Sequence, residues 1–284
     1  MKYEAFDSER YEPKDINAAN CFSNEILERK RQKYRIRFGR LFVGLFIIIF
    51  WEVGAKLGWI DAYYWSSPSK IMSSAQIQWT QKNMAYDIYF TSMSTIYGFV
   101  LGTVGGAVLG LAFWWSKTYA KIFEPYLVMF NAIPKLALAP IMIVLFGIGF
   151  SSKVTLAFLM TVISCALATI SGVENVDRAM ETLLYSLGAA KWQVFIKVVV
   201  PSALPWMLSS LRINISLALA GAIVGEFIAS SHGLGRMVIY AGTILDTTLV
   251  WVGVVMLSIL AMFLYVIVVE IEKWMAGHLA IYYK

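Results

Sequence analysis

The sequence predicts an all-α integral membrane protein with about six transmembrane helices. Of its 284 residues, 59% are hydrophobic and only 15% are charged, and the mean hydropathy is +0.65. In soluble domains about half of the residues are apolar and about a quarter are charged. The apolar residues also gather in segments long enough to cross a bilayer, with basic residues between them. These observations indicate a multi-pass membrane protein.

The apolar segments divide the chain into two tails and a membrane domain. Residues 1–40 are polar and become basic toward the first span, residues 41–273 hold the apolar segments, and residues 274–284 form a short C-terminal tail. Because basic segments stay in the cytoplasm, we expect both termini there and the protein in a bacterial-type plasma (inner) membrane. The basic tail also suits anionic lipid head groups. The expected spans are residues 41–57, 89–115, 122–150, 154–170, 206–229 and 249–269.

Two local patterns add detail to this map. Residues 69–80 follow an aromatic cluster and predict a helix lying in the outer membrane interface. The second span carries glycines four residues apart, which form one ridge and predict close packing against another helix. These glycines are Gly98, Gly102, Gly106 and Gly110.

A charged, amphipathic stretch at residues 177–205 lies between the fourth and fifth spans. Its first half repeats apolar residues at helical spacing. Gly188 then suits a helix C-terminus or a sharp bend, and a second amphipathic run follows at residues 192–200. Pro201 and Pro205 predict the end of that run. The expected structure is a helix, a glycine turn, a second helix and a proline stop at the membrane surface.

This stretch resembles the cytoplasmic EAA loop of binding-protein-dependent ABC importer permeases. The family pattern is E-A-A, three residues, G, nine residues, then I-x-L-P. Gly188 takes the glycine position and residues 198–201 take the I-x-L-P positions, whereas residues 182–184 replace the E-A-A triplet directly after Glu181. A generic pair of amphipathic surface helices is the simpler alternative.

Two further segments carry the same resemblance. Residues 130–149, FNAIPKLALAPIMIVLFGIG, are similar to the family segment P-x-x-A-L-A-P-L…WFGIG, with Leu145 where tryptophan is usual. A third pattern, GLR-x-A…E-x-x…GLG, is matched in the fifth span and the loop after it. The nearest group is the nitrate, sulfonate and taurine-type permeases. The residues that match the third pattern are Leu211, Arg212, Glu226, Gly233, Leu234 and Gly235.

The resemblance implies a type I ABC importer permease fold and a permease subunit of an ATP-driven importer. Such a subunit forms the pathway for a small solute, a nitrate-, sulfonate- or taurine-like anion or a related organic compound, delivered by a solute-binding protein. Its partners would be ABC ATPase subunits and a second permease copy, with a homodimer expected. ATP and Mg would bind the partner ATPase, so we expect no cofactor on this chain and no enzyme activity. The solute stays open.

The resemblance also implies a coupling loop at about residues 174–204, which would dock on the ATPase. The residues expected to make this contact are Arg178, Glu181, Leu184, Tyr185, Gly188, Ala189 and Lys191.

Polar and proline residues within the spans indicate a translocation pathway. Prolines free backbone carbonyls, which are tolerated at membrane depth where protein or a water-filled cavity covers them. A local kink with Lys135 extending toward the interface is the alternative. We expect Glu226 near the outer gate, bonded to backbone or paired with Arg236, rather than at the solute. The candidate pathway residues are Asn131, Pro134, Ser164, Asn214, Ser216 and Glu226.

Other classes of function fit the sequence less well. The two cysteines and two histidines lie far apart in the sequence, so neither a disulfide framework nor a metal site is expected. No Gly-Lys dipeptide occurs, which excludes a P-loop. The net charge of +6 fits basic cytoplasmic loops rather than a nucleic-acid partner. An ion-coupled secondary transporter or channel is the alternative function, but we find no convincing internal repeat. A membrane enzyme would need a catalytic cluster.

Overall fold

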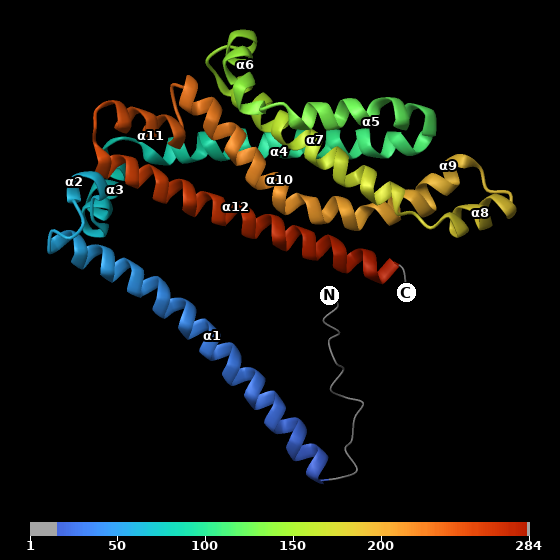
Figure 1. Cartoon of the computed structure of the whole chain (residues 1–284), viewed down its shortest axis with the longest axis horizontal. Coiled ribbons are helices and arrows are strands. Elements are labelled where there is room, and N and C mark those ends of the chain that lie inside the picture. Colours follow the sequence, from blue (N-terminus) through green and yellow to red (C-terminus); the bar gives the residue numbers. More distant parts are fainter. Residues whose placement is uncertain (1–15, 283–284) are drawn as a thin grey trace. The chain divides into compact units, whose positions relative to one another are not determined.

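The computed structural model describes residues 16–282, and every regular element in this range is helical. Of the predicted N-terminal tail, residues 1–15 lie outside the described range. Figure 1 labels the elements. Their bounds are α1 Ile16–Lys56, α2 Ala62–Trp65, α3 Pro68–Gln81, α4 Met84–Trp115, α5 Lys117–Ala132, η1 Lys135–Leu138, α6 Ala139–Phe146, α7 Phe150–Glu174, α8 Arg178–Ser186, α9 Lys191–Val194, η2 Phe195–Val199, α10 Val200–Ile228, α11 Leu234–Thr243 and α12 Thr247–Tyr282.

The chain divides into two units, residues 1–62 and residues 63–284. Within the described part of the first unit, α1 is one helix that includes the predicted first span, residues 41–57. Glu52 and Lys56 form the expected ion pair one turn apart, at 2.9 Å. Phe42, Phe46 and Phe50 stack along one face of α1.

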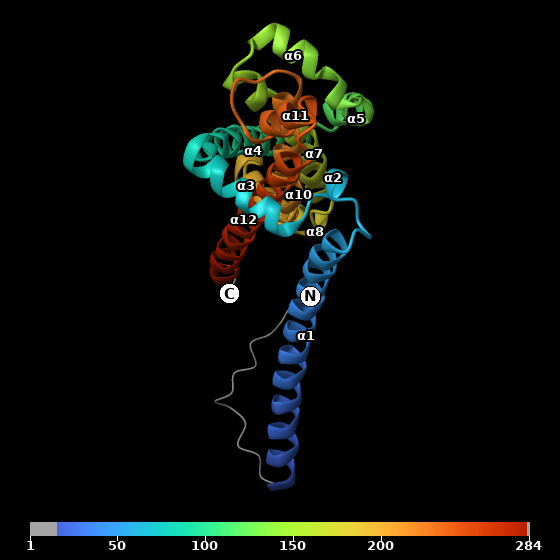
Figure 2. The same cartoon turned by 90° about the vertical axis from the view of Figure 1, so that its left-hand side faces the viewer.

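The second unit is a helical bundle with α7 at its centre. α7 packs along α4 on one side and α10 on the other. Figure 1 shows these three helices side by side, and Figure 2 views the same bundle nearly end on. α12 packs against α10, α11 and α3. Arg212 of α10 and Glu272 of α12 add a two-bond ion pair between these helices.

Small side chains bring α4 and α7 close together. The predicted glycine ridge is buried and faces α7. A Cβ added to Gly102 would lie 1.8 Å from the Thr161 hydroxyl oxygen, and one added to Gly106 would lie 2.4 Å from the Val162 carbonyl oxygen. Cys165 donates across this interface to the Thr103 carbonyl. The predicted packing role of the ridge is therefore confirmed.

Four of the predicted spans appear as long apolar helices. By length and composition, and among the described residues, these are Met84–Trp115, Phe150–Glu174, Lys191–Ile228 and Thr247–Gly277. The proline-rich region makes a fifth crossing only if its two halves count together, because Thr118–Ala132 and Lys135–Phe146 are bent by 81°. The prolines thus break this region as expected.

The predicted proline stop at Pro201 and Pro205 is wrong. The helix continues from Lys191 through η2 into α10 and reaches Ile228. In η2 the backbone adopts a wider π turn, and the Val200 N–H donates to the Phe195 carbonyl. A wider turn displaces the carbonyl that a proline ring would otherwise strike. Pro201 is therefore accommodated by the π turn, whereas Pro205 lies inside α10 without interrupting it.

The helix predicted at residues 69–80 is confirmed as α3, and its position in the outer membrane interface stays a prediction. Ser67 caps its first turn by accepting from the Lys70 N–H. The preceding residue, Ser66, is buried and shares a hydrogen bond of 3.0 Å with the Thr248 hydroxyl at the start of α12. α3 is thereby fixed at the same end of the unit as α11, as Figure 1 shows.

The contact between α4 and α7 generates a paired prediction. Gly106→Ala places a methyl group against backbone, so we expect a loss of about 1–3 kcal/mol in the free energy of unfolding. Gly105→Ala is the matched control, because its added Cβ would lie at an ordinary 3.5 Å from Phe158. Thermal unfolding of both purified variants in detergent measures the difference, and equal unfolding temperatures would contradict the assigned interface.

Candidate functional site

The first candidate site is α8 with the turn that follows it. Asp177 caps the helix by accepting from the Ala179 N–H at 2.8 Å. Gly188 adopts a left-handed conformation with φ +82°. The Gly188 N–H donates to the Tyr185 carbonyl and the Ala189 N–H donates to the Leu184 carbonyl, both at 3.0 Å. These two bonds form a Schellman motif, so the predicted glycine turn is confirmed.

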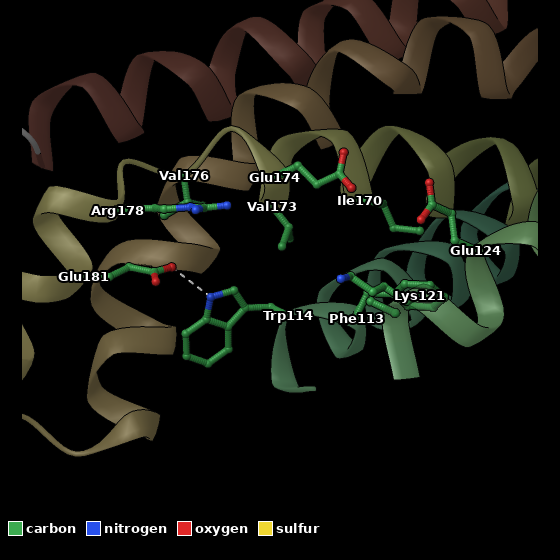
Figure 3. A pocket seen from close by; sticks show the side chains of 11 residues that line it. Phe113, Trp114, Lys121, Glu124, Ile170, Val173, Glu174, Val176, Arg178 and Glu181 are labelled. Atoms are coloured by element: carbon green, nitrogen blue, oxygen red, sulfur yellow. Dashed lines mark hydrogen bonds between the residues drawn. The ribbon is translucent and has the colours of Figure 1, made fainter. Parts of the chain in front are cut away.

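The inner face of α8 is fixed to the bundle. Leu184 packs on a buried cluster of Val176, Val198 and Val199. The Glu181 carboxylate accepts a hydrogen bond of 2.9 Å from the indole N–H of Trp114, at the end of α4. Figure 3 shows this bond at the edge of a pocket. α8 is therefore attached to the bundle by both apolar and polar contacts.

Lys191 attaches the second half of the loop to the same end of α4. Its ammonium group donates to the Trp115 carbonyl and lies 4.9 Å from the centre of the Trp115 ring. Phe195 stacks on Trp192 and contacts Trp114. Two predicted docking residues, Glu181 and Lys191, are thus engaged within the chain. The sequence reasoning missed their tryptophan partners, although tryptophans at the end of an apolar span mark a membrane interface.

The outer face of α8 is apolar and uncovered within the chain. Met180, Leu183 and Leu187 are 57%, 59% and 74% exposed, and they recur at helical spacing on one face. Tyr185 is 44% exposed as well, but it lies five residues after Met180 and therefore on a different face of the helix. The apolar face of Met180, Leu183 and Leu187, on a charged helix at the end of a bundle, is suited to contact with another protein.

A pocket of 290 Å³ lies behind α8, between the ends of α4, α5 and α7. Arg178, another predicted docking residue, extends toward this pocket, as Figure 3 shows. Charges of both signs line the rim. They are Lys121, Glu124, Glu174, Arg178 and Glu181.

The predicted pathway residues fall into separate places. Asn131 and Ser164 line one pocket of 370 Å³ together with Lys135. Pro134 lies at the break before η1. Ser216 lines a different pocket, between α10 and α12. The structure therefore brings Asn131 and Ser164 together but not Ser216.

Asn214 is fully buried in α10 rather than lining either pocket. Its amide group donates to the Ser210 hydroxyl at 3.4 Å. Its carbonyl oxygen has no hydrogen-bond partner within the described part of the chain. A buried polar atom of this kind usually has a partner, but Asn214 is fully enclosed by its own chain.

Glu226 lies buried at the far end of α10 and binds the loop before α11. Its carboxylate accepts from the Thr91 hydroxyl at 2.9 Å and from the Gly235 N–H at 2.8 Å. The Thr91 oxygen in turn accepts from the Leu234 N–H. The expected backbone bond of Glu226 is confirmed. The GLG segment thus closes over a carboxylate, and a Cβ on Gly233 would lie 2.3 Å from it.

Two further charged groups complete this cluster around Glu226, at the α11 end of the bundle. Lys153 of α7 is fully buried and donates to the Ala229 carbonyl just after α10. Asp87 of α4 accepts from the Gly233 N–H at 2.7 Å. Sequence reasoning missed Lys153, Asp87 and Thr91. A lysine within an apolar span is the signal that could have identified the first of them.

The turn after α8 generates a testable prediction. A Cβ at Gly188 would meet no atom within 4 Å, so substitution there strains only the backbone. Gly188→Val should disfavour the turn by about 1–2 kcal/mol, whereas Gly188→Asn should be tolerated because asparagine adopts the left-handed conformation more readily. Limited proteolysis of the loop compares the variants. Equal cleavage rates would show that the turn does not require this conformation.

The cluster around Glu226 generates a second testable prediction. Thr91→Val removes the hydroxyl that bonds Glu226 and Leu234, and leaving buried groups unpaired costs about 1–3 kcal/mol. Thr95→Val is the matched control, since the Thr95 hydroxyl bonds only the Thr91 carbonyl of its own helix. Hydrogen exchange at the Leu234 and Gly235 amides should accelerate in the first variant alone. Unchanged exchange would contradict the role of Thr91.

Comparison with known proteins identifies the family. The profile of the binding-protein-dependent transport system inner membrane component matches residues 98–277. The formylaminopyrimidine transport permease protein ThiX of Halalkalibacterium halodurans is 30% identical, over 81% of this chain and 91% of that protein. The riboflavin transport system permease protein RibX of Chloroflexus aurantiacus is also 30% identical, over 81% and 85%.

A third relative supports the same family, and one solved structure supports the fold. The taurine transport system permease protein TauC of Escherichia coli is 30% identical, over 85% of this chain and 91% of that protein. A solved structure of the MetNI methionine ABC transporter in an inward-facing conformation has a TM-score of 0.59 at 19% identity, covering 66% of this chain and 94% of that one. This likeness supports the type I permease fold.

The family consists of transport permeases rather than enzymes. Membership implies the inner membrane, an ATPase and a solute-binding protein as partners. With a profile match over more than half of its length, the chain belongs to the binding-protein-dependent transport system inner membrane components and is a permease subunit of an ABC importer.

Proposed function

We propose that this permease couples ATP hydrolysis on a partner ATPase to uptake of a small solute through the outer face of α8. The observation that carries the proposal is the exposed apolar row of Met180, Leu183 and Leu187 on a helix whose other face is fixed to the bundle. A helix held in this way moves with the bundle. An ATPase that grips the row would therefore move α8 and the spans together.

The path of this motion follows the covalent and packed connections of α8. On one side the Glu181–Trp114 bond joins α8 to α4. On the other, Lys191–Ile228 forms one apolar rod. Displacement of α8 is therefore passed to two helices that pack on α7, and rocking of packed helices between two arrangements suits alternating access. No covalent chemistry is required of this chain, and ATP and Mg belong to the ATPase.

The orientation follows from charge. The α8 end of the bundle carries Lys121, Arg178, Lys191 and Lys197, and basic loops favour the cytoplasm. We place α8 and both chain termini in the cytoplasm and α11 on the outside, where the solute-binding protein would dock.

A second permease copy completes the pathway in this proposal. Asn131 and Ser164 line a pocket that is open on one side. Polar groups within a span face a bundle or an aqueous route rather than lipid. A second copy of this chain would cover the opening and enclose a route between the two subunits.

The relatives point to several solutes. Their names specify taurine, riboflavin and formylaminopyrimidine transport. We propose a small organic solute within this range, a sulfonate- or taurine-like anion or a related compound.

One substitution tests the coupling surface. Leu183→Gln removes an apolar anchor without touching the inner face of α8, so we expect the affinity for the ATPase to fall about tenfold or more. Thr182→Ala is the control, because the Thr182 hydroxyl bonds only the Arg178 carbonyl of its own helix. Co-purification and stimulated ATP hydrolysis measure the effect. Full stimulation in Leu183→Gln would overturn the docking surface, and uptake without any ATPase would instead favour an ion-coupled transporter.

A further inference from the structure

The pocket at the bent region, lined by Asn131, Lys135 and Ser164, offers mainly hydrogen-bond donors. The Lys135 ammonium donates to the backbone carbonyl and the side-chain oxygen of Asn131, both at 3.1 Å. An ammonium group has three donors, so one remains. Because the Asn131 oxygen is occupied by Lys135, the amide group of Asn131 is left with its N–H donors.

Ser164 supplies another group to the same pocket. Most buried hydroxyls of α7 bond carbonyls of their own helix, as Thr161 and Thr169 do and as such residues commonly do in helices. The Ser164 hydroxyl makes no hydrogen bond within the described residues, and it faces the pocket. Its proton is therefore available to a ligand.

The charge of Lys135 is not balanced within the described chain. The ion pairs there are Glu52–Lys56, Arg212–Glu272 and Glu270–Lys273, and none includes Lys135. A cation in an apolar segment is costly and usually finds a partner. The third donor of Lys135 is therefore free for an anionic group in the pocket.

The rest of the lining is aliphatic. Met160, Leu167 and Leu217 complete the wall, and no aromatic ring contributes to it. A volume of 370 Å³ is within the range of small-molecule sites. An aliphatic wall opposite a cluster of donors suits a short hydrocarbon that carries an oxyanion, and it offers no stacking surface to a flat heterocycle.

We propose that Lys135, Asn131 and Ser164 bind the oxyanion group of a small aliphatic anion, a sulfonate or a carboxylate, on the translocation pathway. This inference rests on the proposed transport function and narrows its solute. Lys135 provides the charge, Asn131 holds the ammonium in place and adds an amide donor, and Ser164 donates from α7. The hydrocarbon lies against Met160 and the two leucines.

The test measures protection of Lys135 from acetylation by acetic anhydride, read by peptide mass spectrometry. The full-length permease is used in complex with its ATPase in lipid nanodiscs. Ethanesulfonate and propanoate are compared with neutral dimethyl sulfone at equal concentration and equal ionic strength. Lys82, exposed after α3, is the internal reference. We expect at least one of the anions, at about ten times its dissociation constant, to slow acetylation of Lys135 about tenfold, because an occupied site is shielded from the reagent, with Lys82 unaffected.

Two variants sharpen the result. Ser164→Ala should raise the anion concentration needed for protection about tenfold. Ser171→Ala is the matched control on the same helix, since the Ser171 hydroxyl bonds the Leu167 carbonyl, and it should leave protection unchanged. The anion that protects Lys135 at the lower concentration identifies the preferred head group, sulfonate or carboxylate.

Equal protection by dimethyl sulfone, or no protection by either anion, would overturn the proposal. ATPase binding and stimulated hydrolysis are measured on the same preparation. Normal stimulation without protection would reject the anion site and keep the transport function. Loss of ATPase binding by the wild-type chain would reject the proposed coupling, while the acetylation readout still reports on the pocket.

Discussion

The close approach of α7 to α4 and α10 is the constraint on which the rest of the bundle depends. Lipid tails are as apolar as the side chains, so helices in a bilayer associate through tight packing and hydrogen bonds. Ala157 shows the principle, because it faces Gly98 on one side and Gly221 on the other. Larger residues at these places would separate the helices. The turn after α8, the proposed anion pocket and the cluster around Glu226 all take their positions from these three helices.

The two ends of the bundle are connected through the same helices. α4 binds Glu181 through Trp114 at one end and Glu226 through Thr91 at the other. α10 continues from the coupling loop at one end and carries Glu226 at the other. At each end, therefore, α4 forms a side-chain hydrogen bond, and α10 runs between the two ends. In the proposed function, a displacement of α8 would reach the loop before α11 through α4 and α10.

Features that depend on residues close together in the sequence could be predicted from the sequence alone. The long apolar helices, the glycine ridge and the left-handed Gly188 all follow from local pattern and steric freedom. Contacts such as Trp114–Glu181 join residues 67 positions apart, and no periodicity encodes them. The error at Pro201 has a related cause, since the π turn that accommodates the ring is stabilised by packing of Val198 and Val199 in the bundle. The sequence likewise could not predict that Asn131 and Ser164 line one pocket, because this depends on the 81° bend between the two halves of the proline-rich region.

The cluster around Glu226 has a consequence for the order in which the bundle assembles during translation. Thr91 precedes Glu226 by 135 positions, and Asp87 precedes Gly233 by 146. Chains emerge from the ribosome N-terminus first, so α4 and α7 are made, with their glycine-lined interface, before α10 and α11 exist. During that interval Thr91 and Asp87 have no acceptor or donor from the later helices. This end of the bundle is therefore completed only after α10 and α11 have been made, and faulty insertion of α10 would leave Thr91 and Asp87 without these partners.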